Sequence, residues 1–124
     1  MPTKAHDTDA GFDLYCPKEV PFLKEAIIDT GVHIEIPKGY VGMIKSKSGL
    51  NVKHGIVCEG VIDAGYTGSM VVKAYNHSDK EYVFKAGDKL TQLVILPIPD
   101  VELEQVDSLE DTERGSNGFG SSGK

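Results

Sequence analysis

Arginine is almost absent from this sequence. Arg114 is the single arginine among 13 lysine and arginine residues, and it lies in a glycine- and serine-rich segment near the C-terminus. The formal net charge is −6. An acidic chain lacks the attraction that general nucleic-acid binding or binding to anionic membranes requires. We therefore expect neither nucleic acid nor membrane as a partner, and any anionic ligand must be small and held by local donors or a metal.

Cysteine and long apolar runs are also scarce. Cys16 and Cys58 lie far apart without CxxC spacing, which favours free buried thiols in a reducing cytoplasm over a zinc site. The 4 histidines show no metal-ligand spacing, and His33 is expected to be an ordinary surface or strand residue. The apolar run 93–98 is too short to cross a bilayer, and no apolar signal segment follows Met1. We expect a cytoplasmic protein.

Short β-like segments bounded by turn residues dominate the 124-residue chain. With no internal repeat and no linker before about residue 107, the pattern predicts one all-β domain, a sandwich, jelly roll or barrel. The single expected helix is 48–54, with Ser48 as N-cap, Gly55 as its stop and Lys47 just before an N-terminus that favours anions. The expected strands are 10–15, 32–36, 40–45, 56–62, 69–75, 81–84, 91–98 and 101–106.

A few polar residues interrupt this strand-like sequence. Asp63 follows an apolar pair and shares a glycine-flanked turn with Tyr66. Composition alone favours a structural turn, but Asp63 could also orient and deprotonate a water while Tyr66 stacks on a flat or sugar-like ligand. Asp13 lies on a strand beside Gly11, where a solvated strand-face carboxylate is the simpler interpretation. Gln92 has apolar neighbours and needs a hydrogen-bond partner, for which a backbone carbonyl serves as well as a ligand.

Residues 111–124 are expected to form a flexible tail on a domain of residues 1–110. The tail matches the letters of dinucleotide and P-loop motifs, but both motifs need a strand before the loop and a helix after it, which the sequence does not provide. Its glycines still allow close approach to phosphate, Arg114 offers a bidentate fork, and Ser121 and Ser122 add donors. The exposed ring of Phe119 needs a surface to lie on. The tail is thus a candidate phosphate clamp that orders on binding.

Motifs distributed over nearly the whole chain support a more specific interpretation. They are Asp9-Ala-Gly-Phe-Asp-Leu14, Lys47-Ser-Gly-Leu50 with Lys53-His-Gly-Ile56, Gly60-Val-Ile-Asp-Ala-Gly-Tyr-Thr-Gly68, Gly87-Asp-Lys-Leu-Thr-Gln-Leu93 and Arg114-Gly-Ser-Asn-Gly-Phe-Gly-Ser-Ser-Gly123. Each motif alone is weak, but in order and spacing the set resembles the homotrimeric dUTPases (deoxyuridine 5′-triphosphate nucleotidohydrolases). The resemblance implies an all-β, distorted jelly-roll or β-clip domain with one short helix, a flexible C-terminal tail and assembly into a homotrimer.

The resemblance also implies roles for individual residues. Asp63 is the implied catalytic residue: it positions a water for in-line attack on the α-phosphorus of dUTP, which releases dUMP and pyrophosphate. Tyr66 packs against the deoxyribose and leaves no room for a 2′-hydroxyl. The tail closes over a site built by other subunits. The remaining implied substrate-binding residues are Gly60, Val61 and Ile62 at the uracil edge, Lys47, Ser48, Gly49 and Gln92 near the phosphates, Arg114, Ser121 and Ser122 on the outer phosphates, and Phe119 with Gly120 over the uracil.

Magnesium is the cofactor that the resemblance implies. Mg²⁺ would be held chiefly by the three phosphates of dUTP, with water-mediated help from Asp13, as expected for an ion that dehydrates reluctantly. A positioned base such as Asp63 supplies roughly 10²–10⁴-fold in rate. Orientation of the substrate and stabilisation of the charge on the phosphates must supply the remainder of the rate acceleration.

The chain departs from the family pattern at several positions. Lys47 stands where relatives commonly have arginine, and Gly65 where a second acid is common. A lysine point charge in place of a guanidinium fork changes how the phosphates are held. Relatives usually begin with an extra strand before the equivalent of residues 2–6, so an unpaired sheet edge is expected to weaken packing or assembly.

Two other functions fit parts of the pattern. A dCTP deaminase shares the fold family, but it calls for a catalytic glutamate and arginines near the nucleotide, whereas this chain has Asp63 and no arginine outside the tail. A non-hydrolytic dUTP-sensing interaction protein would use tail closure to signal the nucleotide level to a partner. Bound dUTP that is not turned over would distinguish that protein from an enzyme. Hydrolysis is favoured because every hydrolytic position is filled.

Overall fold

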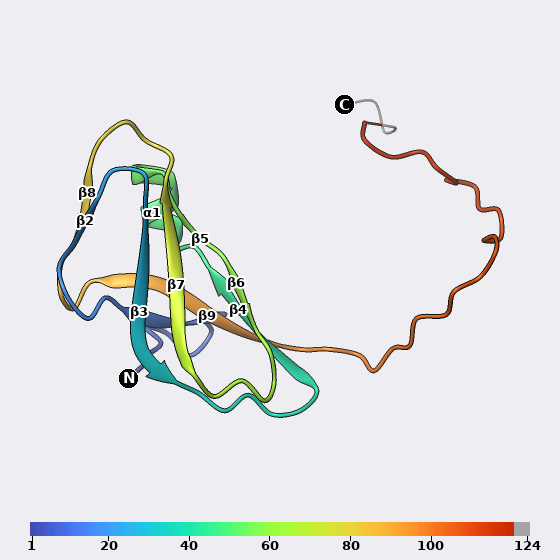
Figure 1. Cartoon of the computed structure of the whole chain (residues 1–124), viewed down its shortest axis with the longest axis horizontal. Helices are drawn as coiled ribbons and strands as arrows, with labels where there is room; N and C mark the ends of the chain where they lie inside the picture. Colours follow the sequence, from blue (N-terminus) through green and yellow to red (C-terminus); the bar gives the residue numbers. More distant parts are fainter. Residues whose placement is uncertain (121–124) are drawn as a thin grey trace.

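Antiparallel strands and one short helix make up the body of the molecule (Figure 1). The computed structural model describes residues 1–120. Its elements are β1 (Gly11–Tyr15), β2 (Val20–Phe22), β3 (Glu25–His33), β4 (Tyr40–Lys45), α1 (Ser48–His54), β5 (Ile56–Cys58), β6 (Gly60–Ile62), β7 (Ser69–Asn76), β8 (Tyr82–Phe84) and β9 (Lys89–Pro97).

The strands form a four-stranded sheet in the order β1-β9-β4-β6, a three-stranded sheet β3-β7-β5 and a two-stranded sheet β2-β8. In the four-stranded sheet β6 is an edge strand, and its register on β4 pairs Ile62 with Gly42 and Gly60 with Ile44. On the other side of β4, Lys45 pairs with Gln92 of β9. These registers place the C-terminal ends of β4 and β6 at opposite ends of the sheet.

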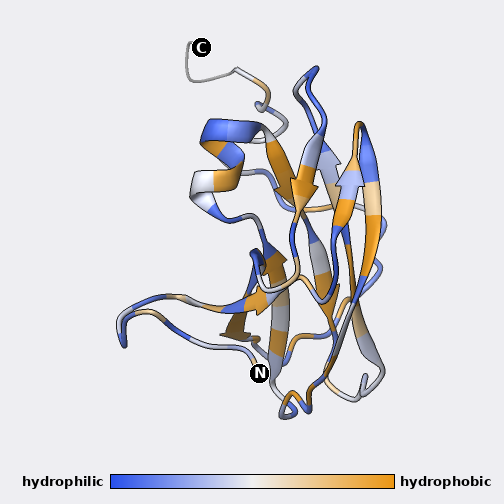
Figure 2. Cartoon of the chain, turned by 90° about the vertical axis from the view of Figure 1, so that its left-hand side faces the viewer, coloured by the Kyte–Doolittle hydropathy of each residue, from blue (hydrophilic) through white to orange (hydrophobic). Residues whose placement is uncertain are grey.

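A single apolar core lies between the sheets. Side chains alternate between core and solvent along the strands, as Figure 2 shows by the alternation of apolar and polar residues. Leu14, Ile44, Met70, Phe84 and Leu93 are almost completely buried. Burying one such side chain contributes about 1.5–3 kcal/mol, so this core is the main stabilising element of the body. The expected all-β jelly-roll class with one short helix is confirmed.

Several expected element boundaries are wrong. The strand expected at 32–36 lies earlier, because β3 runs over 25–33 with a register shift that contains Gly31 at φ 69°. Ile36 is nevertheless buried, so its apolar signal reports core packing from a loop. The strand expected at 56–62 is two strands in different sheets, separated at Glu59. The pattern missed β2, a three-residue strand that contains a proline.

The helix was predicted with the correct span and the correct C-terminal stop. Gly55 ends it in the left-handed conformation, with φ 69°. The expected N-cap is wrong by one residue, because Ser48 is the first helical residue and Lys47 is the cap. Lys47 makes no side-chain capping bond, which leaves the first N–H groups of α1 without a side-chain acceptor at the cap position.

The chain leaves the body after β9. Ile98 N–H still donates to the Gly39 carbonyl at 2.8 Å, and beyond this bond the chain runs away from the sheets as an extended arm (Figure 1). The strand expected at 101–106 does not form, and Leu103 in it is fully exposed. Within residues 1–120, no helix is long and apolar enough to cross a membrane.

Candidate active site

Asp63 lies at the start of an exposed turn that directly follows β6. The carbonyl of Asp63 accepts a hydrogen bond from Tyr66 N–H at 3.2 Å, and Gly65 takes φ 94°, a conformation that glycine adopts without strain. The Asp63 side chain is exposed, and no hydrogen bond or ion pair to its carboxylate forms within residues 1–120. The turn therefore presents a carboxylate that is free to bind a water or substrate.

Tyr66 is held at the rim of a small hollow. Its hydroxyl donates to the Ser69 carbonyl at 2.7 Å, and its ring is 46% exposed. A Cβ added at Gly68 would lie 2.5 Å from the Tyr66 hydroxyl, so this ring position requires a glycine there. The hollow has a volume of about 210 Å³ and is lined by Val61, Ile62, Asp63, Tyr66, Ser69 and Val71.

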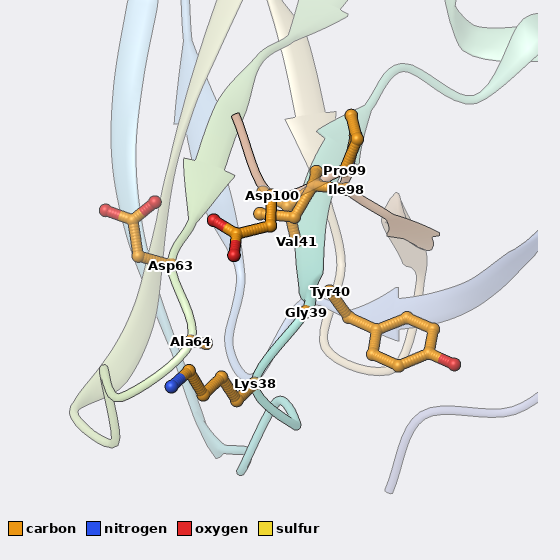
Figure 3. A pocket seen from close by; sticks show the side chains of 9 residues that line it. All are labelled: Lys38, Gly39, Tyr40, Val41, Asp63, Ala64, Ile98, Pro99 and Asp100. Carbon is orange, nitrogen blue, oxygen red and sulfur yellow. The ribbon is translucent and has the colours of Figure 1, made fainter. Parts of the chain in front are cut away.

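A second hollow of about 480 Å³ also has Asp63 in its lining (Figure 3). It is formed where the 38–41 segment meets the root of the C-terminal arm, at Ile98, Pro99 and Asp100. In Figure 3 the Asp63 carboxylate points away from Ala64 and Lys38, and the ring of Tyr40 points away from the hollow. Asp63 thus borders both hollows.

A cationic cluster occupies a different part of the molecule. The Asp13 side chain is only 5% exposed, and its two oxygens bind the ammonium groups of Lys47 and of Lys89, the latter at 3.2 Å. Burial raises the pKa of the Asp13 carboxyl, but the hydrogen bonds and charges of the two lysines outweigh burial and bring the pKa below its ordinary value of 3.8. An ionised Asp13 therefore fixes two cations side by side.

Lys89 was missed by the sequence interpretation, although it lies in the same motif as Gln92. The feature that identifies Lys89 is the pairing of β9 with β1, in which Lys89 lies opposite Tyr15 and Gln92 lies opposite Asp13. Lysines are common on strand surfaces, so only the pairing distinguishes Lys89 from the other lysines.

Gln92 binds the segment that connects β4 to α1. Its amide Nε2–H donates to the Ser46 carbonyl at 2.9 Å, so the partner that it needed is a backbone carbonyl. A Cβ at Gly11 would lie 2.4 Å from the Gln92 side-chain oxygen, so a glycine is needed there too. Ser48 and Gly49 are exposed at the start of α1. The adjoining hollow, about 310 Å³, is lined by Lys47, Gly49, Leu50, Lys53, His54 and Lys89.

The two groups of candidate residues do not meet within one chain. Asp63 follows Ile62, which pairs with Gly42 near the start of β4, whereas Lys47 lies beyond the end of β4. At about 3.3 Å per strand residue, Gly42 and Lys47 are separated by on the order of 15 Å. The hollow beside Lys47 shares no lining residue with either hollow beside Asp63.

The tail residues lie apart from both groups. The Arg114 Nε–H donates to the Asn117 carbonyl at 2.7 Å, and the Phe119 side chain is fully exposed. Both residues belong to the arm that runs away from the sheets (Figure 1). Gly120 takes φ 91°. Ser121 and Ser122 lie outside the described residues. Among residues 1–120, no group of three His, Cys, Asp or Glu side chains is arranged to hold a metal ion.

Known proteins resemble this chain over almost its full length. A sequence profile described as dUTPase matches residues 1–123. The chain is 43% identical to the deoxyuridine 5′-triphosphate nucleotidohydrolase of Kluyveromyces lactis, over 100% of this chain and 86% of that protein. It is 40% identical to the protein of the same name from Clostridium tetani, over 100% and 89%. These names favour hydrolysis over the deaminase and sensor alternatives.

Solved structures of phage dUTPases share the fold. The Staphylococcus bacteriophage 80alpha dUTPase with dUPNHPP has a TM-score of 0.87 at 34% identity, covering 100% of this chain and 92% of that one. A mutant dUTPase from phage phi11 of S. aureus, described for its coordination of a structural Mg(II) ion, has a TM-score of 0.81 at 34% identity and covers 90% and 92%.

Proposed function

Because the chain belongs to the dUTPase family, we propose that it is a dUTP diphosphatase, which hydrolyses dUTP to dUMP and pyrophosphate. The family match over residues 1–123 carries this proposal, since it spans every candidate site residue. The exposed carboxylate of Asp63 supports it chemically, because a base needs free oxygens to accept a proton.

Asp63 acts as the general base. Its carboxylate accepts a proton from a water as the water oxygen bonds to the α-phosphorus. The bond from the α-phosphorus to the oxygen that bridges it to the β-phosphorus breaks on the opposite side, and pyrophosphate leaves. Positioning and charge stabilisation supply most of the acceleration in such phosphoryl transfers.

The phosphates bind at the cationic cluster. Lys47 and Lys89 supply two ammonium groups whose position Asp13 fixes, and the exposed residues Ser48 and Gly49 follow Lys47 at the start of α1, where helix N–H groups have no intrahelical acceptor. Gln92 holds the segment that carries Lys47, through the Ser46 carbonyl. Because both lysines are already paired in the free chain, less ordering remains to be done when dUTP binds.

The residues present fit a magnesium ion that is held mainly by the substrate. Within residues 1–120 there is no all-protein metal cage, and Mg²⁺ commonly keeps several waters and binds through few carboxylates plus phosphates. Asp13 is the ionised carboxylate nearest the phosphate-binding lysines and would hold the ion through water. When bound, the ion neutralises charge that develops on the phosphate oxygens.

The uracil is read by the main chain of β6. This strand is the edge of its sheet, so one side of its backbone is not used by a neighbouring strand in the described chain. Gly60, Val61 and Ile62 can therefore present backbone N–H and carbonyl groups to a base edge as a sheet edge does to a peptide. Tyr66, fixed by Ser69, packs on the deoxyribose and leaves no space for a 2′-hydroxyl.

The complete site forms in a homotrimer. Within one chain the Asp63 group and the Lys47 group lie at opposite ends of β4, which supports a site built from different subunits. The extended arm carries Arg114 and Phe119 away from their own body. We assign residues 111–124 as a lid on the 1–110 domain: Phe119 and Gly120 cover the uracil while Arg114, Ser121 and Ser122 hold the outer phosphates of dUTP on another subunit.

A cytoplasmic location is part of the same proposal. Cys16 and Cys58 are both free and buried, and burial raises the pKa of the Cys58 thiol to about 11. Unreactive buried thiols of this kind suit a reducing compartment.

The decisive experiment measures Mg²⁺-dependent pyrophosphate release from dUTP, with dTTP, dCTP and UTP assayed separately as controls. We compare the full chain with a chain that ends at Glu113. Selective hydrolysis of dUTP by the full chain, with a large loss in the shortened chain, is the expected result. If neither chain releases pyrophosphate from dUTP, the hydrolase assignment is wrong.

A further inference from the structure

The turn that carries Asp63 and Tyr66 is held by side chains of β3. Among the described residues 1–120, the one backbone hydrogen bond that closes this turn outside the strands is that from Tyr66 N–H to the Asp63 carbonyl. The Nδ1 of His33 lies 2.8 Å from the Thr67 carbonyl. Because a carbonyl oxygen only accepts, Nδ1 carries the proton, and His33 is a donor to the turn.

A second link from β3 reaches the same turn through Asp29. The Ser69 hydroxyl donates to Asp29 Oδ1, which also accepts from Gly31 N–H at 3.0 Å. The hydrogen bond from Ser69, followed by that from Gly31, lowers the pKa of Asp29 below its ordinary value, so the carboxylate stays ionised as an acceptor. The register shift between Asp29 and His33 lets both residues reach the turn.

These links converge on Tyr66. The Tyr66 hydroxyl donates to the Ser69 carbonyl at 2.7 Å, and the side chain of the same Ser69 is bound by Asp29. Thr67, which His33 holds, is the next residue after Tyr66. β3 therefore binds two residues that follow Tyr66, namely Thr67 and the Ser69 to which the Tyr66 hydroxyl donates, and the ring lines the hollow of about 210 Å³ together with Asp63 and Ser69.

We propose that His33 is a positioning residue that, together with the Asp29–Ser69 link, holds the Tyr66 ring where it excludes a 2′-hydroxyl. This inference rests on the proposed function, because it assigns to His33 a share of the selection of dUTP over UTP. An aromatic ring that excludes one hydroxyl group must be held to within a fraction of an ångström of the position in which it blocks that hydroxyl. Loss of the His33 bond releases Thr67 and lets the ring move outward, which admits the ribose.

The test compares His33→Leu with His33→Asn in the full chain. Asparagine keeps an N–H donor at about the position of Nδ1, whereas leucine removes it. We expect His33→Leu to lower the ratio of kcat/KM for dUTP to that for UTP by about tenfold, mainly by improving the use of UTP, and His33→Asn to stay within about twofold of the parent. His77→Leu is the matched control, since His77 is an exposed strand-end histidine whose ring makes no hydrogen bond in the described chain.

Ser69→Ala provides a second test that does not depend on the folding of His33→Leu. It removes the link to Asp29 but keeps the carbonyl that Tyr66 uses, and the dUTP preference should fall in the same direction. The inference is wrong if His33→Leu and Ser69→Ala keep the parent ratio, or if His33→Asn falls as far as His33→Leu. Failure of the proposed function looks different, because then the parent chain itself does not hydrolyse dUTP.

Discussion

Among single residues, Asp63 is the one whose substitution should reduce the rate of hydrolysis most clearly. Asp63→Asn keeps the size of the side chain but removes the base, so kcat for dUTP should fall by roughly 10²–10⁴-fold with little change in KM. Pyrophosphate release measures both parameters. Asp100→Asn is a matched control, because Asp100 lines the same hollow but comes from the root of the arm. An equal loss in the two variants would mean that the hollow needs negative charge rather than a base.

Asp13 should contribute to stability in a pH-dependent way. Asp13→Asn leaves Lys47 and Lys89 without their counter-charge, and we expect the free energy of unfolding at about pH 7 to fall by roughly 1–2 kcal/mol. Because the folded-state pKa lies below 3.8, this contribution is complete above that value and disappears as the pH falls through the lowered pKa. Urea unfolding of parent and variant, with the exposed Asp79→Asn as control, measures the difference. If the difference in unfolding free energy between parent and Asp13→Asn grew toward acid pH, this prediction would be wrong.

The sequence indicates isolated residues better than partnerships between them. Asp63 and Tyr66 could be proposed as site residues because an acid and an aromatic ring in a glycine-flanked turn are unusual neighbours, and both side chains are exposed in the structure. Lys89 could not be proposed from the sequence, because its role depends on an ion pair with Asp13, which lies on another strand. The same holds for His33, whose hydrogen bond to Thr67 spans distant parts of the chain.

Among the elements, β4 packs closely around a glycine of its own. A Cβ at Gly42 would lie 2.7 Å from Ile36, 3.0 Å from Leu93 and 3.2 Å from Ile62. Gly42→Ala should therefore cost about 1–3 kcal/mol in the free energy of unfolding. Urea unfolding at fixed protein concentration measures it. Gly49→Ala is the contrast, because that helical position has no neighbour within 4 Å and alanine should stabilise α1 by up to about 1 kcal/mol.

The elements that could be predicted are those in which local pattern and tertiary packing agree. β4 alternates and pairs on both sides, and α1 ends at a glycine in the left-handed conformation, so both were found at 40–45 and 48–54. The segment 101–106 has an apolar pattern, but it pairs with no strand in the described part of the chain and forms no strand itself. β2 is too short for a periodic signal, and its proline argues against a strand.

For the whole molecule, the proposed division of the site between subunits predicts that two inactive chains can restore each other's activity. Asp63→Asn lacks the base, and a chain ending at Glu113 lacks the lid, yet a mixed trimer can combine Asp63 from one chain with the tail of another. Unfolded and refolded together, the two chains should show more pyrophosphate release from dUTP than either refolded alone. Asp63→Asn mixed with itself is the control. No gain on mixing would mean that base and lid come from the same chain.

The open edge of β6 has a consequence for drug resistance and for evolution. Its backbone groups are the same whichever side chains the strand carries, so if β6 reads the base as proposed, point mutations have few ways to change which base is accepted. Sugar selection is different in the proposed site, because there it depends on Tyr66 and on the β3 residues that hold it, each of which one codon change can remove. An inhibitor that binds only the β6 main chain should therefore lose potency to single mutations far more slowly than one that relies on the Tyr66 ring.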